Sequence, residues 1–218
     1  MNWRHLRAFP WLDTRARFVA GTPSGGALLD IGSWDGGTLG HFAELRPDLR
    51  YFATDIEGQP ERYPAGCKFH RGDLRVDPLP WPDGTIDRIT CMHLVEHLGD
   101  LTLLLRETAR LLKPGGQAYF ETPHPKSMIF SSPRGEAAGR CTVNFFDDPQ
   151  HVRPVTLGSL AGQARAAGLE VGPMGTSRNW LFAAAWLVCW LLPPSHQKYT
   201  AYLHWTGWSV YLVAKRPA

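Results

Sequence analysis

The stretch LLDIGSWDGGTL, residues 28–39, joins an apolar run to a glycine-rich turn. The apolar run predicts a buried strand, and the helical spacing of residues 38–47 predicts a helix directly after the turn. Such a turn lets the backbone approach a ligand closely. At Trp34, where these loops usually have glycine, stands the largest side chain. Since a residue with a side chain rarely adopts positive φ, we expect a negative φ at Trp34.

Of two other nucleotide-binding motifs, the dinucleotide fingerprint fits this turn less well and the P-loop is excluded. The string GSWDGG, residues 32–37, lacks the second glycine of the GxGxxG dinucleotide fingerprint. The pattern GxxxxGK[ST] of a P-loop does not occur.

Strand and helix signals alternate along most of the chain. The predicted strands are residues 27–32, 50–57, 67–74, 86–94, 117–123, 169–175 and 207–216, and the predicted helices are residues 38–47, 100–116 and 156–168. This alternation is typical of a parallel sheet with helices on both faces. We therefore predict an α/β fold with a Rossmann-like, doubly wound, mostly parallel seven-stranded sheet.

Two segments interrupt the alternation. Residues 123–154 are rich in proline, glycine and serine, which predicts a lid insertion after the fifth strand. The apolar run LFAAAWLVCWLL, residues 181–192, lies in a hydrophobic insertion before the last strand and is shorter than the about 20 residues that span a bilayer. It fits a buried helix, a substrate wall or a membrane-surface contact.

One domain over residues 1–218 accommodates all of these parts. We expect a cofactor-binding half at residues 25–122, a lid or substrate loop at 123–154, and a C-terminal half at 155–218 with an apolar insertion at 179–205. A formal net charge of +3 without a basic cluster gives no support for nucleic acid as a partner. The four cysteines form no CxxC pair and the N-terminus has no signal-peptide run, so we expect a cytoplasmic location.

Polar residues and a glycine fall at or just past the ends of five predicted strands: Gly32, Asp55, Asp73, His93 and residues 122–124. In open α/β sheets, ligands bind beyond the carboxyl ends of the strands. Asp55 could accept two hydrogen bonds from ribose hydroxyls, and Asp73 could accept one from an amino group such as that of adenine. Together these positions indicate a nucleoside-binding edge.

The chain resembles the class I S-adenosylmethionine-dependent methyltransferases, of the group called methyltransferase type 11. The resemblance covers residues 28–168 and rests on LLDIGSWDGG, TDIE, RGDL, LPWPDGTIDRITCMHLVEHL, ETARLLKPGG and YFETP. It implies S-adenosyl-L-methionine as cofactor and methyl transfer to a small molecule or glycan, with oxygen as the favoured acceptor atom. Residues 147–160 resemble members found beside sugar- and polysaccharide-building enzymes.

The same resemblance implies roles for individual residues in cofactor binding. Ser33, commonly cysteine in the family, and Trp34 are the departures from its pattern. By position, the implied cofactor-binding residues are Gly32, Ser33, Trp34 and Gly36 around the methionine end, Asp55 at the ribose, Ile56 beside the adenine, Asp73 and Leu74 at the adenine edge, and Met92 and His93 near the sulfonium.

A neutral hydroxyl acceptor needs a base to take its proton, and histidine suits this role because its unperturbed pKa is about 6.5. The candidates are His93, His97, His124 and His151. We predict His151 and His124 as the catalytic pair, because they bracket the long loop. Asp148 could orient His151.

A metal site is the alternative to a protein base. Its ligands would be Asp147, Asp148, His124 and His151, but their spacing matches no standard site, so we predict no metal. Arg153 could bind an acidic or sugar group bidentately.

Two other functions stay open. Residues 180–192 suit a methyltransferase for a lipid-like or quinone acceptor, with a peripheral membrane or hydrophobic-substrate contact through this segment. Trp34 keeps open a non-catalytic partner subunit with a methyltransferase fold. The sequence does not indicate an oligomeric state.

Overall fold

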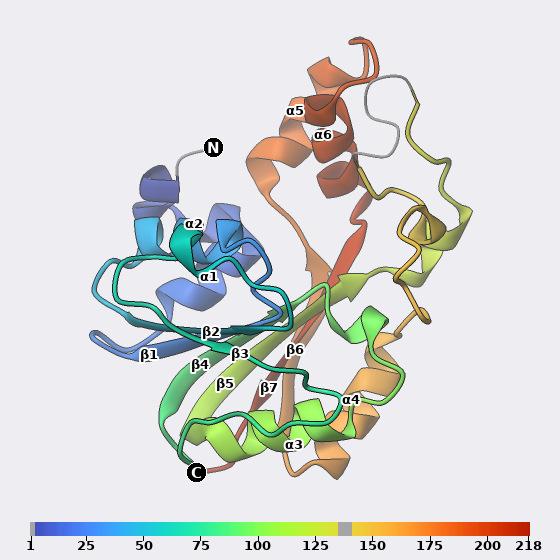
Figure 1. The fold of residues 1–218 in the computed structure, drawn as a ribbon. Helices are drawn as coiled ribbons and strands as arrows, with labels where there is room; N and C mark the ends of the chain where they lie inside the picture. The colour runs from blue at the N-terminus through green and yellow to red at the C-terminus, as the bar shows by residue number, and fades with distance from the viewer. Residues whose placement is uncertain (1–2, 135–140) are drawn as a thin grey trace.

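A computed structural model describes residues 3–134 and 141–218, and its centre is one seven-stranded sheet (Figure 1). The strand order is β3-β2-β1-β4-β5-β7-β6. The strands are β1 Ala27–Ile31, β2 Arg50–Asp55, β3 Lys68–Arg71, β4 Ile86–Met92, β5 Leu112–Pro123, β6 Glu170–Ser177 and β7 Ser209–Lys215. Strand β7 is antiparallel to both of its neighbours, and the other pairings are parallel. The predicted doubly wound, mostly parallel sheet is therefore confirmed.

Helices cover both faces of the sheet (Figure 1). Helices α1 Thr14–Ala20 and α2 Gly37–Leu45 lie on one face, and α3 Thr102–Leu111 and α4 Leu157–Ala166 lie on the other. Strand β1 serves both layers because successive side chains of a strand point to opposite faces. Leu28 packs with α1 and α2, whereas Leu29 and Ile31 pack with α3 and α4.

Helix α3 is shorter than the predicted helix at residues 100–116. It begins at Thr102, whose N–H donates to Asp100 Oδ1 at 2.9 Å, and it ends at Leu111. Strand β5 begins at Leu112, which pairs with Ile86. A proline at position 114 cannot continue a helix, and the apolar periodicity of the helix runs into the buried strand without a break.

The two interruptions have different structures. Between β5 and α4 the described residues form short 3-10 turns, η5 Pro125–Ile129 and η7 Phe145–Asp147. Between β6 and β7 the chain forms a helical hairpin of α5 Trp180–Cys189 and α6 His196–Thr206, which projects from the body of the molecule (Figure 1). None of the described helices is long and apolar enough to cross a bilayer.

Candidate active site

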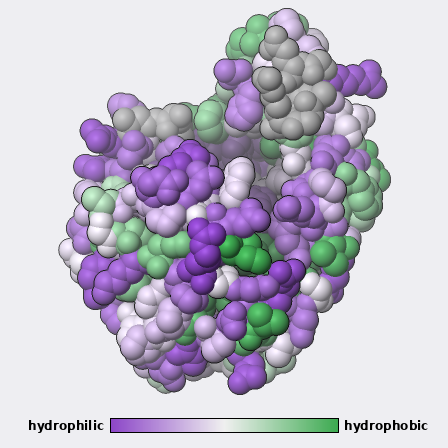
Figure 2. Space-filling model, viewed as in Figure 1, coloured by the Kyte–Doolittle hydropathy of each residue, from purple (hydrophilic) through white to green (hydrophobic). Residues whose placement is uncertain are grey.

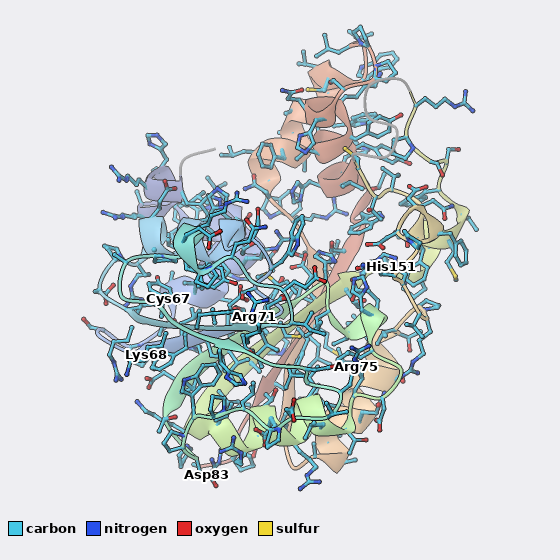
Figure 3. All side chains as sticks on the ribbon, viewed as in Figure 1. Cys67, Lys68, Arg71, Arg75, Asp83 and His151 are labelled. Atoms are coloured by element: carbon cyan, nitrogen blue, oxygen red, sulfur yellow. The ribbon has the colours of Figure 1, made fainter. Side chains whose placement is uncertain are left out.

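A cleft of about 880 Å³ opens at the carboxyl ends of the parallel strands. Its walls come from the loops that follow four strands: residues 32–35 after β1, 55–57 after β2, 72–75 after β3 and 92–94 after β4. The 3-10 turn η4, Val95–His97, and the segment before α4 complete it. Figure 3 shows Arg75 and His151 on different loops beyond the sheet. Four of the five strand ends singled out in the sequence, at Gly32, Asp55, Asp73 and His93, thus share one cavity of a size usual for small-molecule sites, whereas residues 122–124 do not line it.

Gly32 and Gly36, in the turn after β1, have different roles in the site. Gly32 lines the cleft with φ of 79°. Gly36 has φ of 75° and is the N-cap of α2, but it does not line the cleft. A Cβ at Gly36 would lie 2.2 Å from Cδ1 of Tyr63, so this glycine lets Tyr63 pack against the turn. Gly36 therefore affects the cleft indirectly, by allowing Tyr63 to pack against the turn that lines it.

Trp34 has φ of +39°, and our expectation of a negative φ was wrong. Hydrogen bonds fix its backbone in this conformation: its N–H donates to Asp55 Oδ2 at 2.8 Å, and its carbonyl accepts from the Tyr63 hydroxyl at 2.9 Å. The Trp34 side chain is 66% exposed at the rim of the cleft. It does not fill the cleft, so the residue that kept a non-catalytic role open presents no obstruction.

The two aspartates at the strand ends both line the cleft. The Asp55 carboxylate accepts backbone N–H groups from Trp34 and Glu57, and each of its oxygens keeps a lone pair free for a further donor. Asp73 forms an ion pair of 2.7 Å with Arg75, whose hydrogen bond lowers the pKa of the Asp73 carboxyl.

The other residues implied as cofactor contacts also reach the cavity. The remaining lining residues of this group are Ser33, Ile56, Leu74, Met92 and His93. The Ser33 side chain is fixed by a hydrogen bond of 2.9 Å between its hydroxyl and the Tyr63 hydroxyl.

A chain of charges that the sequence analysis missed runs from Arg15 and His93, which line the cleft, to buried glutamates. Arg15 forms an ion pair with Glu121, which is fully buried in β5. His93 lies between two carboxylates, with Nδ1 3.2 Å from Glu96 Oε1 and Nε2 3.3 Å from Glu121 Oε1. Thr122 donates to the other Glu96 oxygen at 3.0 Å. The one sequence signal was a glutamate directly after the apolar residues Ala118, Tyr119 and Phe120 of the predicted strand.

This environment decides the charge of His93. Burial alone would lower its pKa, but the hydrogen bonds with Glu121 and Glu96 raise the pKa of His93 to about 9. His93 is therefore an imidazolium at neutral pH and is unsuited to act as a general base.

Asp30, in the middle of β1, is a second buried charge that lines the cleft. The Thr90 hydroxyl donates to Asp30 Oδ1 at 2.7 Å. Burial raises the pKa of Asp30 to about 7, against the lowering effect of that hydrogen bond.

Of the remaining histidines, His97 is the one that lines the cleft. Its Nδ1 lies 3.1 Å from the Gln150 carbonyl oxygen. Because a carbonyl only accepts, Nδ1 carries the proton of the neutral ring and Nε2 keeps the lone pair.

His151 and His124, the predicted catalytic pair, do not line the cleft. The His151 side chain is 4% exposed, with its ring centre 4.8 Å from that of His97 and its Nδ1 2.6 Å from the Phe145 carbonyl oxygen. Asp148 could orient His151 by a hydrogen bond only at a shorter distance, because Asp148 Oδ2 is 3.8 Å from His151 Nε2. His124 Nδ1 accepts the Lys126 N–H and caps η5.

Three side chains near the cleft could hold a metal ion. One carboxylate oxygen of Glu96 and one ring nitrogen each of His97 and His151 lie within 4.8 Å of one another. This set shares only His151 with the four ligands weighed in the sequence. Asp147 instead accepts the N–H groups of Val143 and Asn144 within its own turn.

The comparisons with known proteins agree with this architecture. Residues 3–172 match the family model described as a methyltransferase domain. A relative from Bordetella avium (strain 197N), named ubiquinone biosynthesis O-methyltransferase, is 36% identical over 166 residues, covering 72% of this chain and 67% of that protein. One from Pseudomonas syringae pv. tomato with the same name is 28% identical over 174 residues, covering 74% and 69%.

Solved structures share the fold. An S-adenosylmethionine-dependent methyltransferase from Mesorhizobium loti matches with a TM-score of 0.64 at 18% identity, over 96% of this chain and 98% of that one. A phosphoethanolamine N-methyltransferase from Haemonchus contortus, in complex with S-adenosyl-L-methionine, matches with a TM-score of 0.59 at 15% identity, over 93% and 51%.

The fold and the strand-end cleft define a class I methyltransferase. The chain belongs to the methyltransferase-domain family, and it is an S-adenosylmethionine-dependent methyltransferase. The cleft fits that cofactor: it has a close backbone approach at Gly32 and a carboxylate with free lone pairs at Asp55.

Proposed function

We propose that the chain methylates an oxygen of a small quinone-type or phenolic acceptor. The observation that carries this proposal is the 36% identity to a protein named as an O-methyltransferase of ubiquinone biosynthesis. The cleft also suits a flat apolar acceptor, because Met92, Leu94, Leu98 and Val152 are among its lining residues. The glycan acceptor and the acceptor role of Arg153 remain predictions from the sequence, and no reported relative supports them.

The cofactor supplies an electrophilic methyl group, so the protein's main task is to place the acceptor oxygen in line with it. Proximity and orientation of this kind are worth about 7–11 kcal/mol of the barrier. In the proposed arrangement, the Gly32 turn carries the methionine end, Asp55 accepts the ribose hydroxyls, and Asp73 with Leu74 borders the adenine. Asp73 would have to loosen its ion pair with Arg75 to accept a hydrogen bond from the base.

His97 is the proposed general base, in place of the predicted His151 and His124. Its Nδ1–H is held by the Gln150 carbonyl, which leaves Nε2 with a lone pair to take the acceptor proton. His151 packs against the His97 ring and so positions it.

The segment before α4 is proposed as the acceptor-side wall of the site. Asp148, Gln150 and Val152 line the cleft, and the Val152 N–H donates to the Glu96 carbonyl at 2.9 Å. This supports a substrate-loop role within the predicted lid at 123–154, part of which (residues 135–140) lies outside the described residues. The division of residues 1–218 and the cytoplasmic location remain predictions.

The proposal is tested by offering the purified protein S-adenosylmethionine with a hydroxylated quinol, a simple catechol or an oligosaccharide. We expect S-adenosylhomocysteine to form with the phenolic acceptors, and mass spectrometry to show one added methyl group on oxygen. Methylation of the oligosaccharide alone would overturn the acceptor assignment.

A further inference from the structure

The hairpin of α5 and α6 exposes an apolar surface that nothing in the described structure covers. Helix α5 contains no charged residue, and of its ten residues only Ala183 is buried. A helix that is apolar all round is normally buried in a core or a membrane. The apolar tip of the hairpin is between 47% and 70% exposed and consists of Leu187, Val188, Trp190, Leu191 and Leu192.

The inner faces of the hairpin are already packed. Trp186 lies against Tyr202 with ring centres 5.1 Å apart, and Phe182 stacks on His204 at 5.4 Å. On its outer side the apolar tip therefore meets no partner within residues 3–134 and 141–218. The hairpin projects from the body of the molecule, so this surface is convex, and apolar residues are visible as green spheres at the top of Figure 2.

The charged residues of the hairpin itself have one sign. The sequence from residue 171 to residue 218 contains no aspartate or glutamate. Lys198 Nζ donates to the Trp190 carbonyl at 2.8 Å, and Arg178 donates to the His204 carbonyl at 2.8 Å, so each cation caps the end of one hairpin helix. Among the described residues neither cation forms an ion pair with a carboxylate.

We propose that the apolar tip inserts into the surface of a lipid bilayer that carries anionic headgroups. A ten-residue helix is about 15 Å long, half of the about 30 Å hydrocarbon thickness, so the hairpin reaches the outer part of one leaflet without spanning it. Tryptophan and lysine beside aliphatic side chains are the composition of interfacial anchors. A convex apolar surface with an uncompensated positive charge suits a deformable anionic surface better than it suits the surface of a folded protein.

Co-sedimentation with vesicles tests this proposal on the full chain. Vesicles of phosphatidylcholine with phosphatidylglycerol are compared with vesicles of phosphatidylcholine alone. We expect binding to the anionic vesicles that weakens with added salt. The triple variant Leu187→Ser, Val188→Ser, Leu191→Ser should reduce this binding at least about tenfold.

The matched control is Val76→Ser, which removes an equally exposed apolar side chain in the loop after β3. This variant should bind vesicles like the unaltered protein. Quenching of tryptophan fluorescence by brominated lipids reports insertion directly and should fall in Trp190→Phe. Unaltered protein that stays in the supernatant with both kinds of vesicle would overturn the proposal. Size-exclusion chromatography showing a dimer that the triple variant dissociates would overturn it too, in favour of a second copy of the chain.

This inference does not rest on the acceptor. Titration with S-adenosylhomocysteine and methylation of a water-soluble catechol should be the same for the triple variant and the unaltered protein, provided that vesicles are absent. If those assays fail while vesicle binding is seen, the proposed function is wrong and the membrane contact stands.

Discussion

Asp55 uses both of its carboxylate oxygens to hold backbone N–H groups of the loops around it, and it also faces the cleft. We expect Asp55→Ala to weaken binding of S-adenosylhomocysteine by about 1–3 kcal/mol, because ribose hydroxyls would lose their acceptor. Isothermal titration calorimetry measures this change. Glu61→Ala removes a carboxylate outside the cleft lining and should leave the affinity unchanged. Equal affinities for both variants would refute the ribose assignment.

Substitution of His97 and of His124 tests which of two histidines is the general base. His97 is the base proposed from the structure, and His124 belongs to the pair predicted from the sequence. His97→Gln should lower kcat by about 10²–10⁴-fold, the usual contribution of a general base, without changing the affinity for S-adenosylhomocysteine. His124→Gln should keep kcat, since its ring caps η5. Steady-state kinetics decide between the two, and the opposite pattern would return the role to His124.

Asp30 links the stability of the fold to pH. Its pKa rises from 3.8 to about 7 on folding, so the folded protein holds this proton more tightly than the unfolded chain does. Stability therefore falls as pH rises through that window, and Asp30→Asn should remove this dependence. The variant should gain relative stability up to about pH 7, by at most about 4 kcal/mol at about 1.4 kcal/mol per pKa unit. Urea denaturation at several pH values measures this, and a difference that does not change with pH would contradict it.

At the scale of elements, the turn between β1 and α2 depends on Gly36. Gly36→Ala would place a Cβ 2.2 Å from Tyr63 Cδ1 at a φ of 75°, so it should cost about 2 kcal/mol or more of unfolding free energy. Gly40 lies in the middle of α2 with nothing within 4 Å of its Cβ position. Gly40→Ala should instead be neutral or gain about 0.5–1 kcal/mol. Urea denaturation of the two variants provides the comparison.

The elements were predictable where a local rule decides them. The alternation of apolar runs with amphipathic spacing was enough for the doubly wound sheet, and the helix predicted at residues 156–168 is present as α4, with Thr156 as its N-cap. Predictions from the type of a single residue or from local periodicity were wrong where contacts between residues far apart in sequence decide the backbone conformation. Trp34 adopts positive φ because Asp55 and Tyr63, distant in sequence, hold its backbone. The boundary between α3 and β5 was missed because pairing of Leu112 with Ile86 determines it.

The candidate site was predictable from sequence only in its outline. Strand-end residues such as Asp55 and Asp73 could be placed because parallel strands bring their carboxyl ends to one edge. The residues that decide the protonation state of a histidine could not be predicted from the sequence. His93 is an imidazolium because Glu96 and Glu121 flank it, and His97 rather than His151 reaches the cleft because of how η4 is placed.

At the scale of the whole molecule, the buried charges join parts of the chain that are far apart. Arg15 in α1 and Glu121 in β5 are 106 residues apart in sequence, and His93 connects Glu121 to Glu96 in η4. The chain of charges thus ties the N-terminal helix to the loops that carry the cleft. Removing one member would leave a buried charge without its partner, which is costly in a protein interior.

Strand β7 is the last strand along the chain, yet it lies inside the sheet, between β5 and β6. On a ribosome, β6 and the α5–α6 hairpin therefore emerge before the strand that holds them against the rest of the sheet. Until residues 209–215 have joined the sheet, β6 has no strand beside it among those described, and the apolar helix α5 stays attached to an incompletely folded part of the chain. Exposed apolar surface and an unpaired strand edge make such a partly folded chain prone to aggregation.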